Sequence, residues 1–254
     1  MLPGFVYKYL EKILHLKQVN YVLRNFGDLP PIEFIHSTLD HMGVRYHMAG
    51  LEKLDRKGRY IFASNHPFGG MDGMMLAEGI SGYMGDVRVV VNDLLMNVGP
   101  LAPIFVPINK HGRQSSDSAR LMREIYQSDM PILTFPAGLC SRRTKGVVCD
   151  SRWKPNFIKM AVEYKRDIVP VYVPGRLSDF FYRLANLRTR LGIKANIEML
   201  YLVDQMWRQS GNEFEIVVGE PIPWQEFSGK GIKPADAAQM IKERVYSLNE
   251  EVNF

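Results

Sequence analysis

Cysteine is scarce in this chain: only Cys140 and Cys149 occur among 254 residues. A secreted fold held together by disulfides is therefore disfavoured, because such folds need several paired cysteines. The first residues also lack a cleavable apolar leader, so we expect a reducing, cytoplasmic compartment and two free thiols. Cys140 lies inside a motif described below, and a reactive role for it stays open.

Long apolar runs are missing as well. No stretch approaches the roughly 20 residues that a helix needs to cross a bilayer, so a membrane role would be peripheral. Internal repeats, low-complexity tracts and long linkers are equally absent. With 46% hydrophobic residues, the chain has enough apolar material for the core of one large domain.

Acidic residues are the minority among the charged ones. The 32 lysines and arginines exceed the 27 aspartates and glutamates, for a formal charge of +5 and a pI near 9.1. This excess favours anionic partners such as phosphates, nucleic acid or an acidic lipid surface. Nucleic acid is the weakest of these, because basic and acidic residues are interleaved and no recognised reading motif is present. The six histidines are scattered without paired ligand spacing, so no metal is expected.

The sequence pattern of the first 43 residues predicts a helical segment that precedes the main domain. Apolar residues recur at helical spacing in residues 1–26, with lysines between them, as in a basic amphipathic helix. Its apolar face contains Phe5, Tyr9, Ile13, Leu16 and Leu23. Such a helix lies on an acidic membrane or packs against the body of the domain. Residues 28–31 interrupt it, and a second helix is expected over 32–42.

The sequence of residues 44–254 predicts an α/β domain, because short β-rich runs alternate with helical segments. The expected strands are 45–47, 60–63, 87–91, 104–107, 132–135, 168–173 and 214–218. The expected helices are 73–79, 93–97, 115–127, 156–164, 180–191 and 234–249. Residues 197–203 fit either a strand or a helix.

A histidine and an aspartate flank a glycine turn directly after the expected strand at 60–63. The string is Ser64-Asn65-His66-Pro67-Phe68-Gly69-Gly70-Met71-Asp72. A histidine accepts a proton near neutral pH, and a carboxylate on its other ring nitrogen fixes the tautomer and stabilises the imidazolium. The pair therefore suits a general base and its orienting partner, at the sheet edge where α/β folds place ligands. Alternatively, Asp72 only caps the next helix and His66 is an ordinary turn residue.

Three further strand ends lead into polar or glycine-rich strings. The first is Ile108-Asn109-Lys110-His111-Gly112-Arg113, which can present cations to a phosphate. The second is Pro136-Ala137-Gly138-Leu139-Cys140-Ser141-Arg142-Arg143, which ends in hydroxyl and guanidinium groups. The third is Ile168-Val169-Pro170-Val171-Tyr172-Val173-Pro174-Gly175-Arg176, whose prolines indicate a strand that ends at a substrate channel. A solvated basic loop and an ordinary core strand are the alternatives.

Together the four strings resemble the glycerolipid and lysophospholipid acyltransferase family. That family has a His-x4-Asp motif, a second motif with a basic residue, a Phe-Pro-Glu-Gly motif and a late proline-containing strand, and the order matches over residues 60–175. The resemblance is strongest to the hemolysin-like branch, which includes the O-acyltransferases that make bacterial ornithine or glycine aminolipids. Strings like residues 65–73, 135–138 and 169–172 recur in that branch, and the likeness extends to 219–222. It implies a single mixed β-sheet flanked by helices.

Two departures from the wider family bear on the acceptor. Five residues separate His66 from Asp72 instead of four, so the Gly69-Gly70 turn must absorb the extra residue, which the backbone freedom of glycine allows. Ala137 stands where the common motif has a glutamate, which removes a carboxylate from the acceptor side. Both departures point away from a lysophosphatidate or glycerol-phosphate acceptor and toward a lyso-aminolipid or related substrate.

The resemblance implies transfer of a fatty acyl group from the thioester of acyl carrier protein or coenzyme A to the hydroxyl of a lyso-lipid. The acceptor would be a lyso-aminolipid or a lysophospholipid, in membrane lipid biosynthesis. His66 would remove the hydroxyl proton and Asp72 would orient it, so no protein nucleophile is needed. Backbone N–H groups near Gly69 and Gly70 would stabilise the charge on the carbonyl oxygen.

Arg142 is the first candidate for holding an anionic headgroup or the pantetheine phosphate. The supporting candidates are Ser141, Arg143, Lys110 and Arg113. The implied partners are the thioester co-substrate, the lyso-lipid and the membrane surface, without a bound cofactor and without nucleic acid. The expected location is the cytoplasmic face of the inner membrane, with peripheral attachment.

Two other functions stay open at this stage. Water could replace the acceptor alcohol, which would make the protein a thioesterase or lipid hydrolase. A non-catalytic, peripheral lipid-binding protein could use the basic N-terminal helix and an apolar cleft.

Overall fold

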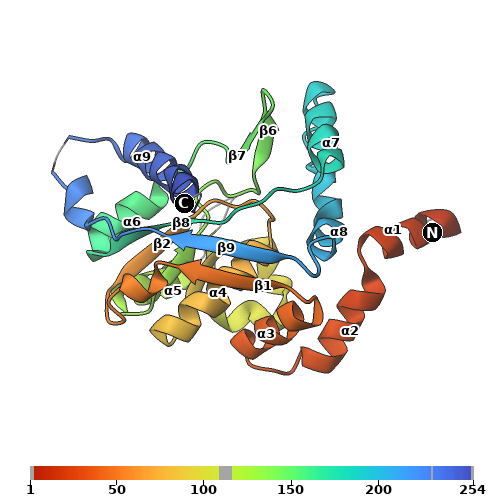
Figure 1. Ribbon diagram of the computed structural model, residues 1–254, viewed down its shortest axis with the longest axis horizontal. Coiled ribbons are helices and arrows are strands. Elements are labelled where there is room, and N and C mark those ends of the chain that lie inside the picture. The colour runs from red at the N-terminus through yellow and green to blue at the C-terminus, as the bar shows by residue number, and fades with distance from the viewer. Residues whose placement is uncertain (1–2, 109–115, 230, 253–254) are drawn as a thin grey trace.

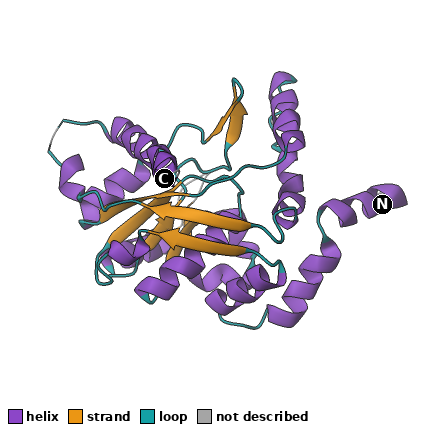
Figure 2. Ribbon diagram, in the orientation of Figure 1, coloured by secondary structure: helices purple, strands orange, loops and turns teal. Residues whose placement is uncertain are grey.

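The computed structural model describes residues 3–108, 116–229 and 231–252. Helices cover both faces of one central sheet, and the N-terminal helices extend away from one end of it (Figures 1 and 2). Lys110 and Arg113, two of the predicted anion-binding residues, lie outside the described residues.

The central sheet has seven strands in the order β1-β9-β8-β2-β5-β3-β4. Their bounds are β1 Arg45–Ala49, β2 Tyr60–Ser64, β3 Arg88–Asn92, β4 Phe105–Ile108, β5 Ile132–Thr134, β8 Asp167–Tyr172 and β9 Glu213–Val218. Neighbouring strands are parallel except β8 and β9, which are antiparallel. The predicted mixed sheet is therefore confirmed. A separate antiparallel hairpin, β6 (Arg142–Thr144) and β7 (Val147–Cys149), is not predicted by the sequence pattern.

The N-terminal amphipathic segment forms two helices, so the prediction of one continuous helix is wrong. α1 (Gly4–Ile13) and α2 (Leu16–Phe26) are separated where His15 takes a left-handed φ of 47°. α3 (Pro31–His41) follows, with Phe34 and Ile35 buried against the body. The division of the chain between residues 43 and 44 stays a prediction.

The remaining helices are α4 Met71–Met84, α5 Ser116–Gln127, α6 Asn156–Tyr164, α7 Asp179–Arg190, α8 Leu202–Trp207 and α9 Pro234–Ser247. The segment left open at 197–203 is helical: the 3-10 helix η4 (Ile197–Tyr201) runs into α8. Residues 93–97 form a 3-10 helix, η2 (Asp93–Asn97), and not an α-helix. No helix of the described residues is long and apolar enough to span a membrane.

Two hydrophobic cores lie on opposite faces of the sheet because successive strand side chains alternate between the faces. Phe62 and Val169 belong to the core under α3 and α4, whereas Ile61 and Ile168 belong to the core under α5, α6 and α9. All four are fully buried, and each such side chain contributes about 1.5–3 kcal/mol to stability.

Adjacent strand ends position the site. Ala63 of β2 pairs with Thr134 of β5 in parallel register, so the chain leaves both strands at the same edge of the sheet. The segment that carries His66 therefore lies beside the segment that begins with Phe135.

Candidate active site

His66 and Asp72 meet across the turn between β2 and α4. Asp72 Oδ2 lies 3.0 Å from His66 Nδ1. The carboxylate is fully buried, and the imidazole is 16% exposed. The turn accommodates the extra residue at Gly69, whose φ of +79° favours glycine. The observed distance is that of a hydrogen bond.

Main-chain groups of the same turn hold the Asp72 carboxylate. Oδ2 also accepts hydrogen bonds from the N–H of Phe68 at 3.0 Å and of Gly69 at 3.4 Å, and Oδ1 accepts one from Gly73 N at 2.9 Å. Asp72 lies in the first turn of α4, and Gly70 is the N-cap. The alternative that Asp72 only caps the helix is thus incomplete, because this carboxylate orders the turn and also contacts the imidazole.

The two groups shift each other's pKa toward the charged forms. Burial lowers the pKa of His66, but the charge and hydrogen bond of Asp72, with the charge of Asp150, outweigh it and raise the pKa above 6.5. Burial raises the pKa of Asp72, but the charge and hydrogen bond of His66 and the turn N–H groups lower it below 3.8. With Nδ1 engaged by the carboxylate, His66 has Nε2 left for a substrate.

The segment after β5 holds the histidine in place. The imidazole stacks on the Phe135 ring with centroids 4.0 Å apart. The His66 carbonyl accepts a hydrogen bond from Ser141 N at 2.8 Å, and His66 N donates to Asp150 Oδ1 at 3.3 Å. Two of the four predicted motifs therefore meet at His66.

Asp150 is a buried residue of this site that the sequence does not reveal. Its side chain accepts hydrogen bonds from Ser141 Oγ at 2.7 Å and from Trp153 Nε1 at 2.9 Å. Burial raises the pKa of Asp150, although these hydrogen bonds oppose the shift. A single aspartate just after a hairpin carries no spacing signal, so only its contacts identify it. The Ser141 hydroxyl, a predicted ligand, is already used here.

The two predicted arginine ligands among the described residues, Arg142 and Arg143, both have protein partners. Arg142 Nη2 donates to Glu198 Oε1 at 3.1 Å, and Arg143 Nη1 donates to Asp179 Oδ1 at 3.0 Å. Arg142 Nη1 also donates to the carbonyl and thiol of Cys140. A role for either arginine in binding an anion stays a prediction.

Cys140 is not activated by its surroundings. Burial raises the pKa of its thiol to about 11, although the Arg142 guanidinium opposes this shift. A thiolate nucleophile at neutral pH is therefore disfavoured. Within the described residues, no group of three or more His, Cys, Asp and Glu side chains could hold a metal ion.

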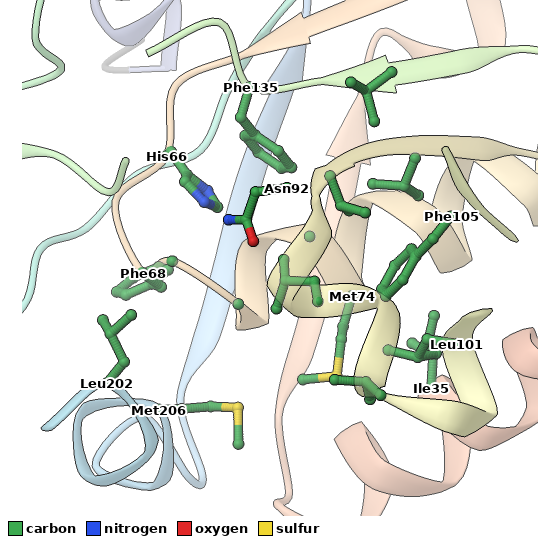
Figure 3. A pocket seen from close by; sticks show the side chains of 18 of the residues that line it. Ile35, His66, Phe68, Met74, Asn92, Leu101, Phe105, Phe135, Leu202 and Met206 are labelled. Atoms are coloured by element: carbon green, nitrogen blue, oxygen red, sulfur yellow. The ribbon is translucent and has the colours of Figure 1, made fainter. Parts of the chain in front are cut away.

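A cavity of about 770 Å³ opens beside His66. Much of its lining consists of apolar side chains from the N-terminal helices, α4, the chain before β4, and α8. Figure 3 shows Ile35, Met74, Leu101, Phe105, Leu202 and Met206 among them. His66 and Phe135 line the wall, and Asn92, at the end of β3, lies near the imidazole (Figure 3). The cavity suits a substrate with a long hydrocarbon chain.

The lining of the cavity also includes the polar residues Lys154 and Asn156. Lys154 is the one lysine or arginine among the described residues that line the cavity. Its Nζ lies over the Gly138 backbone, 3.4 Å from where a Cβ would stand. Sequence reasoning missed Lys154 and Asn92, because neither belongs to one of the four motifs.

The fold is α/β, and its candidate site places a His–Asp pair beside a large, mostly apolar cavity. The chain belongs to the acyltransferase family, whose model matches residues 1–253. The resemblance predicted from the motifs is thereby confirmed.

Two relatives support the assignment, and one solved structure shares the fold. The chain is 45% identical to a lyso-glycine lipid O-acyltransferase of Bacteroides thetaiotaomicron, over 97% of this chain and 91% of the relative. It is 44% identical to one of Phocaeicola vulgatus, over 97% and 88%. Its fold is similar to the crystal structure of the 1-acyl-sn-glycerophosphate acyltransferase PlsC from Thermotoga maritima, with a TM-score of 0.55 and 14% identity over 96% and 95% of the chains.

Proposed function

We propose that this acyltransferase moves a fatty acyl group from an acyl thioester to the hydroxyl of a lyso-glycine lipid. The observation that carries the proposal is the His66–Asp72 pair at the wall of a large apolar cavity. The acceptor is inferred from the two relatives, each matched over 97% of this chain. The thioester is that of acyl carrier protein or coenzyme A.

His66 acts as the general base. Its Nε2 takes the proton of the acceptor hydroxyl while the hydroxyl oxygen attacks the thioester carbonyl, and Asp72 stabilises the imidazolium that forms. When the C–S bond breaks, the imidazolium returns the proton to the leaving thiol. The raised pKa of His66 strengthens the base once it is neutral.

The start of α4 supplies candidates to stabilise the developing oxyanion. Gly69 and Gly70 line the cavity, and the N–H of Gly70 has no acceptor among the described residues. An N–H group at a helix N-terminus is favourably placed for negative charge.

Lys154, the one cation among the described lining residues, suits an anionic group. A glycine headgroup linked through its nitrogen keeps a carboxylate, which Lys154 can pair with. Ala137, buried where the wider family has a glutamate, leaves no carboxylate there to repel it. Arg142, with Ser141, Arg143, Lys110 and Arg113, remains the proposed second set for the pantetheine phosphate or the headgroup.

We propose that the enzyme works at the cytoplasmic face of the inner membrane, where it would meet a lipid acceptor. α1 supports this place, because Phe5 is 76% exposed and Tyr7 and Tyr9 are also exposed beside Lys8 and Lys12. Aromatic and basic side chains on one short helix suit the headgroup boundary of an acidic bilayer.

A product assay tests the proposed function. Purified protein is incubated with acyl-coenzyme A or acyl carrier protein thioester and one of three acceptors: lyso-glycine lipid, lyso-ornithine lipid or lysophosphatidate. We expect the O-acylated glycine lipid by mass spectrometry, and its loss in His66→Ala. Preference for lysophosphatidate would overturn the acceptor, and equal thioester consumption without any lipid would indicate a hydrolase.

A further inference from the structure

The outer face of α7 is apolar and basic. Phe180 and Leu187, and Leu191 just after the helix, recur at helical spacing, with Arg183 and Arg190 between them, and all five side chains are exposed. The opposite face packs on the body through Phe181, Tyr182 and Ala185. An outward helix face usually carries mixed charges, so this apolar face requires an explanation.

Exposed apolar side chains continue along the chain to the end of η4. The exposed apolar residues of this surface, hereafter the α7–η4 face, are Phe180, Leu187, Leu191, Ile193, Ile197 and Leu200. Each is between 36% and 63% exposed. Six large apolar side chains on one connected segment exceed the isolated exposed residues that any soluble surface shows.

The charges of the α7–η4 face have one sign. No acidic residue lies between Phe180 and Ile197, whereas Arg183, Arg190 and Lys194 are exposed there. The flanking carboxylates are both paired. Asp179 contacts Arg143 and Arg176, and the fully buried Glu198 contacts Arg142 and Arg188. The face is therefore complementary to an anionic surface.

Neighbouring elements extend this face. The β6–β7 hairpin lies beside α7 (Figure 1), where Asn186 donates to the Arg143 carbonyl, and its tip exposes Val147. α1 reaches the same region, because the Tyr9 and Tyr201 hydroxyls lie 2.5 Å apart. The Tyr201 ring in turn contacts the Phe180 ring at 5.0 Å.

The chain that forms the α7–η4 face leads directly into residues that line the cavity. η4 ends at Tyr201, and the next residues, Leu202 and Val203, line the cavity together with Met206. A lipid held against this face would thus lie near a segment whose side chains line the cavity.

We infer that the α7–η4 face docks on an anionic lipid bilayer, as a membrane contact in addition to α1. Its apolar side chains enter the headgroup boundary, and Arg183, Arg190 and Lys194 pair with lipid phosphates. A second copy of the chain fits less well, because a symmetric contact would bring these cations together. The inference rests on the proposed function only in that the acceptor is a membrane lipid.

Vesicle binding without turnover tests the inference. Wild type, L187Q/L191Q and R183Q/R190Q are floated with phosphatidylcholine vesicles with and without 30% phosphatidylglycerol, at roughly physiological salt. The matched control is L121Q/M240Q, which removes two exposed apolar side chains from α5 and α9. We expect L187Q/L191Q to lower the partition coefficient about tenfold or more. R183Q/R190Q should lower binding only to the anionic vesicles, and the control should bind like wild type.

Turnover in detergent micelles separates this inference from the proposed function. With lyso-lipid and thioester in micelles, L187Q/L191Q should keep wild-type kcat, because neither leucine lines the site. Failure of wild type to form product, with the binding pattern intact, would reject the proposed function and support the docking face. If L187Q/L191Q fails to fold, as judged by its thermal melt, R183Q/R190Q alone decides.

Two results would overturn the inference. One is that L187Q/L191Q and R183Q/R190Q both bind vesicles as well as wild type does. The other is a dimer of the wild-type protein in sedimentation that is lost in L187Q/L191Q and R183Q/R190Q, while their vesicle binding is unchanged. That result would assign the face to a second copy of the chain.

Discussion

Glu198 Oε1 accepts a hydrogen bond from Arg142 Nη2 at 3.1 Å, and the carboxylate is fully buried. Arg188 approaches from the other side, with Nε 2.8 Å from Oε2. The arginine that the sequence offers as an anion ligand is thus already the partner of a buried acid. Removing one member of such a pair is costly, because the remaining charge stays buried.

Arg142→Ala should therefore destabilise the protein by about 3 kcal/mol, measured by urea unfolding. The control, Arg143→Ala, breaks a more exposed pair with Asp179 and should cost about 1 kcal/mol or less. Since the Arg142 charge lowers the pKa of His66, its loss should also move the acid limb of activity to higher pH. Unchanged stability with a raised KM for one substrate would instead support Arg142 as a ligand.

Asp72→Asn should shift the pH profile in the opposite direction. In wild type the acid limb of kcat/KM lies above pH 6.5, because His66 must lose its proton to act as a base and its pKa is raised. The variant lacks the charge that raises this pKa, so burial should bring the limb to lower pH, while kcat falls by about 10²- to 10⁴-fold. A limb that does not move would show that another group titrates.

The His66–Asp72 pair should also make stability depend on pH. The raised pKa of His66 stabilises the fold fully below pH 6.5, and this contribution is lost as the pH rises through the raised value. The lowered pKa of Asp72 stabilises the fold above pH 3.8, and this contribution is lost as the pH falls through the lowered value. The stability difference between wild type and His66→Gln should be largest between these pH values. A difference independent of pH, in urea unfolding, would contradict the ion pair.

Lys154→Met should raise the KM of the anionic substrate about tenfold, equivalent to one charge-assisted hydrogen bond, with little change in kcat. The matched control is Lys159→Met, an exposed lysine of α6 that does not line the cavity. Steady-state kinetics with donor and acceptor varied separately identify which substrate Lys154 contacts. Equal KM values in both variants would remove Lys154 from the site.

Gly175→Ala should destabilise the protein beyond the cost of backbone strain. Gly175 has a φ of +109°, and a Cβ there would lie 2.4 Å from the Phe68 ring, inside the His66–Asp72 turn. The control is Gly85→Ala, whose φ is +92° with open space around the Cβ. We expect about 1–3 kcal/mol more loss at Gly175 than at Gly85, and lower activity. Equal losses in thermal unfolding would show that Phe68 moves freely.

The sequence alone determined the features that depend on neighbouring residues. Alternating apolar runs predict the strands, and the Gly69-Gly70 turn predicts that His66 and Asp72 can meet, because strand alternation and turn geometry act over a few residues. Element ends were less well determined: the helix expected over 73–79 runs from Met71 to Met84, and residues 197–203 stayed open. The break at His15 was missed, since the apolar spacing continues through it.

Only the tertiary structure decided which distant groups become partners. Asp150 contacts His66 across 84 positions of sequence, and Glu198 contacts Arg142 across 56. The order of the strands and the packing of the hairpin and α7 create these contacts, and likewise bring Lys154 to the cavity. A buried charge or hydrogen bond depends on where the chain folds back, because desolvation and partner distance are set by packing and not by sequence spacing.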